Sequence, residues 1–107
     1  AAALDAASRR LWVCYYDTSG DSKRGRAWYS CTSSRDGRGW TKPVRAARDS
    51  ASTDVLWEDA RVYSYGDTIG FGGTTAVAAA DGTVHPFWID TRDLEGKKQE
   101  IFGATLP

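Results

Sequence analysis

The sequence predicts an all-β protein built of antiparallel sheets with four strands each. Short runs rich in aromatic and β-branched residues alternate along the 107-residue chain with turns rich in glycine. Such runs favour strands. The eleven glycines and the absence of methionine leave little material for a helix bundle. The most strongly patterned stretch runs from Leu11 to Ser33 and contains both cysteines of the chain.

This stretch is typical of a β-hairpin closed by a disulfide. The runs Leu11 to Asp17 and Ala27 to Ser33 flank a polar segment with two glycines. With these boundaries Cys14 lies directly opposite Cys31, where Cβ atoms are roughly 4.5–5.5 Å apart. We therefore predict a Cys14–Cys31 disulfide, which favours a secreted, extracellular protein. The alternative is a pair of reduced, buried thiols.

The other elements follow in order around this hairpin. A short strand is expected before it, and a Pro-started edge strand after it. An Asp-Gly pair marks a second hairpin turn near the C-terminus. The expected strands are Ala1 to Ala7, Leu11 to Asp17, Ala27 to Ser33, Pro43 to Ala47, Ile69 to Ala80, Thr83 to Thr91 and Glu100 to Leu106, with a connector over Arg48 to Asp54 and an ordered loop over Val55 to Gly70.

The two halves of the chain are copies of one unit. Aligned without gaps, Ala2 to Thr18 lies over Thr75 to Thr91, which places Cys14 over Phe87, and one deletion then places Cys31 over Gly103. Repeated four-stranded sheets are the blades of a β-propeller. We expect a first blade over residues 1–47, an inter-blade loop over 48–68 and a second blade over 69–107, which lacks its fourth strand.

Two blades cannot close a ring, because propellers typically have four to eight. The chain is therefore expected to be the C-terminal part of a longer propeller, or to share a ring with further copies of itself. A small sandwich of seven strands is the competing all-β architecture. Basic and acidic residues balance at 14 each, and no apolar run is long enough to cross a bilayer, so neither nucleic acid nor a membrane is expected as a partner.

The segment SRDGRGW, from Ser34 to Trp40, resembles the Asp-box of bacterial sialidases and related BNR-repeat propellers. Ser34, Asp36 and Trp40 match the family pattern, although the spacing is one residue short. The resemblance implies a structural turn between the third and fourth strands of a blade, in which the aspartate accepts backbone N–H groups and the tryptophan packs beneath it. It also implies that the functional face lies at the opposite ends of the strands, where the loops between the second and third strands and between successive blades lie.

A long loop on that opposite face carries the candidate ligand residues. The sequence LWEDARVYSYGD gathers aromatic, acidic and basic side chains within twelve residues. Aromatic faces beside charged groups suit a sugar, because its C–H faces stack and its hydroxyl groups need polar partners. The alternative is that the tryptophan fills a gap between blades while the charged residues pair at the surface. The candidates are Trp57, Glu58, Asp59, Arg61, Tyr63, Tyr65 and Asp67, with Arg92 on a neighbouring loop.

No catalytic residue is predicted within this chain. The sialidase resemblance implies a tyrosine nucleophile at a fixed distance before Gly82, but Gly73 stands at that place. Asp17 and Asp90 occupy equivalent repeat positions, which favours a shared turn role over catalysis. The single histidine, His85, lies within a predicted strand, and no spacing of histidine and cysteine suggests a metal.

These observations lead to three hypotheses. The first is a secreted, sialidase-like propeller that binds carbohydrate through its loop face. The second is a fragment of a glycoside hydrolase of the exo-sialidase type with its catalytic residues on other blades. The third is an oligomeric lectin in which three chains close a six-bladed ring. No cofactor is expected in any of them.

Overall fold

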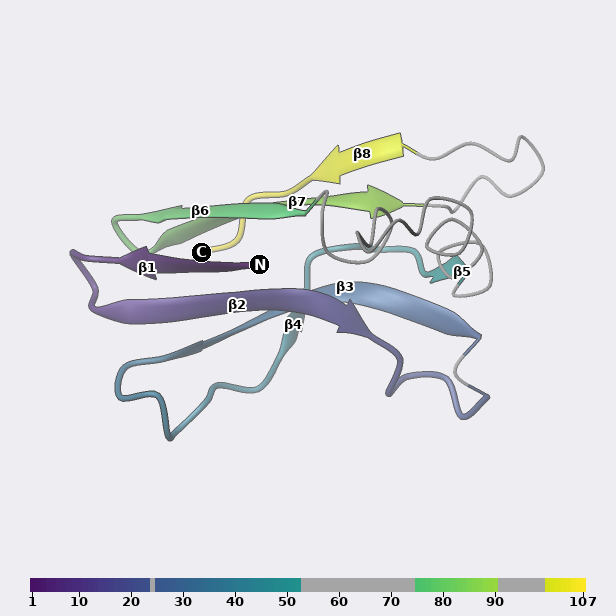
Figure 1. The fold of residues 1–107 in the computed structure, drawn as a ribbon, viewed down its shortest axis with the longest axis horizontal. Coiled ribbons are helices and arrows are strands. Elements are labelled where there is room, and N and C mark those ends of the chain that lie inside the picture. The colour runs from purple at the N-terminus through teal and green to yellow at the C-terminus, as the bar shows by residue number, and fades with distance from the viewer. Residues whose placement is uncertain (24, 53–74, 91–99) are drawn as a thin grey trace, which may run out of the picture.

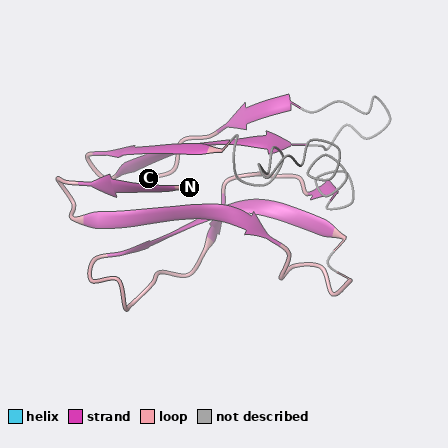
Figure 2. Cartoon of the chain, viewed as in Figure 1, coloured by secondary structure: helices cyan, strands magenta, loops and turns pink. Residues whose placement is uncertain are grey.

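The computed structural model describes residues 1–23, 25–52, 75–90 and 100–107, and these ranges are all-β. Figures 1 and 2 show two antiparallel sheets and no helix in the described part, which therefore holds no apolar helix of membrane-spanning length. The predicted all-β class is confirmed. The strands are β1 (Ala2–Asp5), β2 (Arg10–Asp17), β3 (Arg26–Ser34), β4 (Val44–Arg45), β5 (Ala51–Ser52), β6 (Ala76–Ala80), β7 (Thr83–Asp90) and β8 (Glu100–Gly103).

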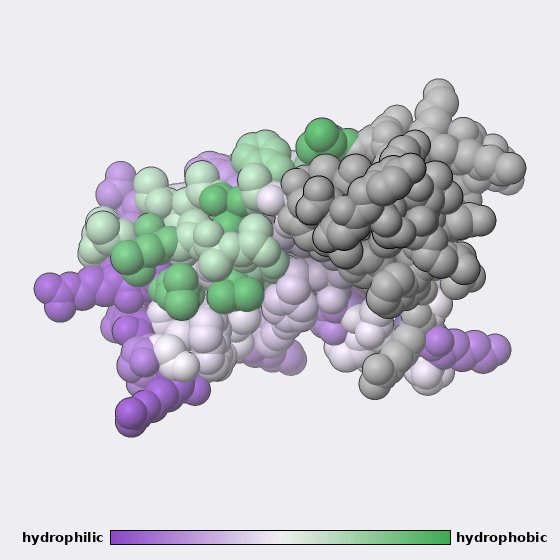
Figure 3. Space-filling view, viewed as in Figure 1, coloured by the Kyte–Doolittle hydropathy of each residue, from purple (hydrophilic) through white to green (hydrophobic). Residues whose placement is uncertain are grey.

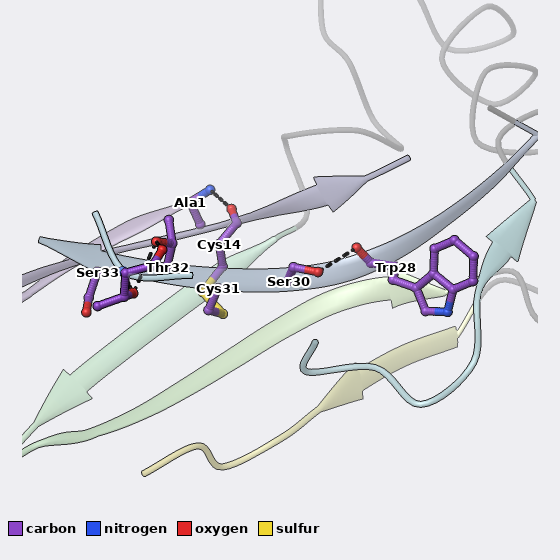
Figure 4. The surroundings of a disulfide bond; sticks show 8 residues. Ala1, Cys14, Trp28, Ser30, Cys31, Thr32 and Ser33 are labelled. Carbon is purple, nitrogen blue, oxygen red and sulfur yellow. Dashed lines mark hydrogen bonds between the residues drawn. A yellow bond between two sulfur atoms is a disulfide. The ribbon is translucent and has the colours of Figure 1, made fainter. Parts of the chain in front are cut away.

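The first sheet has the order β1-β2-β3-β4. Its central pair, β2 and β3, has the predicted register, in which Cys14 lies opposite Cys31. The two residues form a disulfide with their Cα atoms 4.1 Å apart, so the predicted pairing is confirmed (Figure 4). The covalent bond therefore joins the two longest strands of this sheet at directly opposed positions.

The outer edge of β3 differs from the expected single strand. Only β4 pairs with it beside the disulfide, and the next two residues, Ala46 and Ala47, both donate their backbone N–H groups to the carbonyl of Tyr29. The chain then returns to the same edge as β5, which pairs with Arg26 and Ala27. The segment expected to be only a connector therefore contains a strand, because free backbone groups on β3 remained to be paired.

The second sheet has the order β6-β7-β8. Asp81 and Gly82 both have positive φ values, 52° and 82°, as a two-residue hairpin turn of type I′ requires. Beyond β8 the backbones of Leu106 and Val84 exchange two hydrogen bonds of 2.8 and 2.9 Å, so pairing reaches nearly to the C-terminus. The part of the expected Ile69 to Ala80 strand that precedes residue 75 lies outside the described residues.

The two sheets pack against each other around one core. Its centre is the ring of Tyr29, which stacks on Trp88 of the second sheet at 5.2 Å between ring centroids and an interplanar angle of 13°. Figure 1 shows β1 and β6 side by side where the two sheets meet. The buried core residues are Trp12, Cys14, Tyr29, Cys31 and Ala47 from the first half of the chain, and Val84 and Trp88 from the second.

Candidate functional site

The predicted ligand residues are not placed by the structure. Trp57, Glu58, Asp59, Arg61, Tyr63, Tyr65, Asp67 and Arg92 all lie outside the described residues. The β2–β3 loop and β5 lie at the same end of the first sheet, opposite the end that carries the turn from Ser34 to Trp40 (Figure 1). The described part of the predicted loop face is therefore this loop and the strand ends that carry it.

Two aspartates hold the β2–β3 loop in shape. The Asp17 carboxylate accepts the Ser19 N–H at 2.9 Å. Asp21 accepts the N–H groups of Lys23 and Gly25, each at 3.1 Å. The Ser19 N–H is the main cause that lowers the pKa of Asp17, so this carboxylate is ionised at neutral pH. Asp17 therefore has the turn role that the sequence favoured.

The same loop lies over a tryptophan that is paired with an arginine. The Arg45 guanidinium carbon stands 4.1 Å from the centroid of the Trp28 ring, within the range of a cation–π contact. A Cβ atom at Gly20 would lie 2.5 Å from Arg45 Nη2 and 2.9 Å from the Trp28 ring, so a side chain here would displace the Arg45 guanidinium and the Trp28 ring. This end of the first sheet thus combines an aromatic ring, a cation and the nearby Asp17 carboxylate.

A second arginine at this end, Arg26, binds the residue that precedes β5. Arg26 donates its Nε–H to the Ser50 hydroxyl at 2.8 Å and an Nη2–H to the Ser50 carbonyl. Because Arg26 also pairs with Ser52 in the sheet, β5 is held by side chain and backbone together. The described chain is therefore held beside the start of β3 as far as Ser52.

The opposite end of the first sheet carries the turn from Ser34 to Trp40. The Asp36 Oδ1 atom accepts the N–H groups of Arg38 and Gly39 at 2.8 and 2.9 Å, and the Ser34 hydroxyl accepts that of Gly37 at 2.8 Å. The Arg38 and Gly39 N–H groups, in that order, are the main causes that lower the pKa of Asp36. The backbone of Trp40 forms an isolated antiparallel β-bridge with Ser34, and 44% of the residue is exposed.

Sequence reasoning missed the residue that joins the two sheets, Asp5. Its carboxylate is buried, with 1% of the residue exposed. Within its own turn it accepts the Ala7 N–H at 3.1 Å and the Ser8 hydroxyl at 2.6 Å. From the second sheet it accepts the N–H groups of Asp81 at 3.2 Å and Gly82 at 2.6 Å. The Asp-x-x-Ser pattern signalled the first pair of bonds, but nothing local signalled the second.

The described residues hold no metal site. No group of three or more histidine, cysteine, aspartate or glutamate side chains able to hold a metal ion occurs among them. His85 instead has its Nδ1 atom 3.1 Å from the Thr105 hydroxyl across the second sheet. At the loop end, the Trp28 ring, the Arg45 guanidinium and the Asp17 carboxylate supply groups for stacking, ion pairing and hydrogen bonding. In comparisons with protein-family models, with curated proteins and with solved structures, no match to this chain was found.

Proposed function

We propose that this chain forms two consecutive blades of a sialidase-like β-propeller. The observation that carries the proposal is the direction in which the sheets stack. Repeat-equivalent pairs have the same register in both sheets, since Cys14 opposes Cys31 and Phe87 opposes Gly103. Leu11 opposes Ser34 in the same way as Val84 opposes Leu106.

Equivalent residues point in the same direction along the stack. Cys14 is buried in the core and faces the second sheet, whereas its equivalent Phe87 is 46% exposed. The same contrast holds for Tyr29, which is buried, and Ile101, which is 73% exposed. The sheets therefore stack head to tail, as blades do. A sandwich related by a two-fold axis would instead turn both equivalent faces inward.

The free surfaces support additional blades. The exposed face of the second sheet presents Phe87 and Ile101, and the exposed face of the first presents Leu4, which is 66% exposed. Apolar residues on both outer faces are what an internal pair of blades needs on its two sides. The second sheet also has no strand on the outer edge of β8 among the described residues, whereas β3 has β4 and β5 at the corresponding edge.

We further propose that the loop face binds carbohydrate and that the protein is secreted. The disulfide supports an oxidising compartment. The turn around Asp36 supports the division of the molecule into a structural end and a functional end, because its Oδ1 atom accepts the N–H groups of its own turn. At the other end Trp28, Arg45 and Asp17 provide the stacking and polar groups that sugar recognition uses.

Two other functions remain as alternatives under the same fold. In a glycoside hydrolase the acid, base and arginine residues would come from other blades of the parent chain. In an oligomeric lectin three chains would close a six-bladed ring, for which the apolar outer faces are the natural contacts.

Binding to immobilised glycans tests the proposal, with the full chain and the variants Trp57→Ala and Arg61→Ala. We expect both variants to bind the preferred glycan about tenfold more weakly at an unchanged melting temperature. The control, Arg38→Ala, removes a cation from the opposite end and is expected to leave binding unchanged. Unchanged affinity with a lower melting temperature in both variants would contradict the proposal, because the two residues would then be structural.

The alternatives have separate tests. Light scattering after size-exclusion chromatography gives the mass in solution, and a trimer is the result expected of the lectin. A monomer would exclude the oligomeric lectin. Turnover of a fluorogenic sialoside by the longer parent chain is expected of the hydrolase, and no turnover leaves binding alone.

A further inference from the structure

Two adjoining hollows lie at the turn end of the first sheet, away from the proposed loop face. One has a volume of about 310 Å³ and the other about 370 Å³. Arg10, Ser33 and Thr41 line both, so the two hollows form one groove. This volume accommodates a short ligand, and we call it the turn groove. Its further lining includes Arg35, Asp36, Gly39 and Trp40 on one side, and Ser8, Trp12, Lys42, Val44, Gly82 and Pro107 on the other.

The turn groove carries cations without matching anions. Among the described residues none of Arg10, Arg35 and Lys42 forms an ion pair, and Arg10 donates one Nη1–H to the Ser33 hydroxyl at 3.1 Å. Asp36 is the only carboxylate among the described lining residues, its Oδ1 atom accepts backbone N–H groups of its own turn, and its single negative charge does not balance the three cations. Asp5, close to the groove, is likewise engaged by four donors. The groove therefore has positive charge available for an anion.

Two tryptophans add aromatic surface to the lining of the turn groove. Trp40 is 44% exposed and offers a flat apolar surface in one hollow. Trp12 is 8% exposed and lines the other, and its buried Nε1–H has no acceptor among the described residues. The ring of Trp40 is therefore the aromatic surface that a ligand in the groove can reach.

We propose that the turn groove binds an acidic saccharide. Its carboxylate or sulfate group pairs with Arg10 and Lys42, and the face of a sugar ring stacks on Trp40. Neither group alone specifies this ligand: an inorganic anion would need no exposed indole, and a neutral sugar would need no unpaired cations. The site is independent of the proposed loop face, which lies at the other end of the strands.

Isothermal titration of the full chain distinguishes the possible ligands. The probes are a tetragalacturonate, which carries only carboxylates, a sulfated tetrasaccharide and the neutral maltotetraose. We expect at least one acidic probe to bind, with an affinity that falls as sodium chloride is raised, and the neutral probe not to bind. Comparison of the two acidic probes identifies the anionic group. Equal binding of the neutral probe, or binding of none of the three, would overturn the proposal.

Substitutions in and beside the turn groove test whether the acidic probe binds there. Trp40→Ala and Lys42→Gln are expected to weaken the acidic probe about tenfold each, while Arg38→Gln, on the same turn but outside the groove lining, keeps wild-type affinity. The amide resonances of residues 33–42 should shift on titration in the folded wild-type protein. Shifts confined to residues 17–28 would assign the probe to the loop face and reject the turn groove. Equal affinity in all three variants would do the same.

Discussion

The carboxylate of Asp5 shows how one residue can couple two parts of a chain. It is buried, and it accepts hydrogen bonds from the turns of both sheets. We expect Asp5→Asn to lower the melting temperature at pH 7, because the amide offers one acceptor oxygen where the carboxylate offers two. Thermal unfolding followed by circular dichroism measures the change. Asp21→Asn, which alters a carboxylate that caps only its own loop, is the matched control.

The pH dependence follows from the same contacts. The Ser8 hydroxyl first, and then the Gly82 N–H, lower the pKa of Asp5 below the usual value of an aspartate. A carboxyl whose pKa is lower in the folded state contributes stability above its unfolded pKa, and loses this as the pH falls through its folded pKa. The difference between wild type and Asp5→Asn should therefore be full above about pH 5 and shrink below about pH 4. A difference that grows on acidification would contradict this assignment.

A second residue-scale prediction concerns Gly103. A Cβ atom at this position would lie 2.8 Å from two carbon atoms of the Phe87 ring. Gly103→Ala should therefore cost about 1 kcal/mol of unfolding free energy, a modest value because the half-exposed ring can turn away. Urea unfolding measures it. In the Phe87→Ala background the same substitution should be close to neutral, and a cost unchanged by removal of the ring would show that strain lies in the backbone instead.

At the scale of the elements, the β2–β3 hairpin depends on its disulfide. The bond closes a loop between residues 17 positions apart. On the chain-entropy account, a loop of this length stabilises the folded state by about 3 kcal/mol. Cys14→Ala with Cys31→Ala should lower the unfolding free energy by roughly this amount in a urea titration. Reducing agent should destabilise the wild type to a similar extent and leave the double variant unaffected. Equal stability with and without the bond would contradict the prediction.

The same hairpin shows what the sequence could and could not predict about elements. Its register followed from two runs of strand-forming residues and the position of two cysteines, and Asp81 with Gly82 predicted the second hairpin. The strand β5 escaped prediction because two small residues carry no alternation of polar and apolar side chains.

The gapless alignment of the two repeats is wrong at their first strands, again because these strands carry little side-chain pattern. A constant offset places Leu4 over Val77, whereas in the sheets Ala79 occupies the position of Leu4. The loop after β1 is longer than the two-residue turn after β6, and alanine-rich strands give little information with which to detect the difference.

For the candidate site, the sequence predicted the role of Asp17 and the acceptor role of Asp36, since both follow the local turn chemistry of aspartate. It could not predict the Trp28–Arg45 contact or the bonds from Asp5 to the second sheet. Both join residues that are far apart in the sequence, so no short pattern marks them.

At the scale of the whole molecule, the stacked rings of Tyr29 and Trp88 join the two sheets in one core, so we expect the sheets to unfold as one cooperative unit. Trp88→Ala should cost about 3–5 kcal/mol, because it removes a large buried side chain at the centre of the core. Hydrogen exchange followed by NMR should then show faster exchange in β2 and β3 as well as in β7. If only the second sheet lost protection, the sheets would be independent folding units.

The direction of the stack was the least predictable property of the whole molecule. Both faces of each sheet carry apolar residues, so the sequence pattern does not indicate which face turns inward. The contrast between the buried Cys14 and Tyr29 and their exposed equivalents, Phe87 and Ile101, establishes it.

This contrast also limits how the protein can associate with itself. If the outer faces of two copies meet in the way that the two sheets meet within one chain, the front of one copy contacts the back of the next, which is a heterologous contact. Association through such contacts continues from one copy to the next. It therefore ends either in a closed ring or in an open fibre. A partner that covered Phe87 and Ile101 would consequently also block such polymerisation.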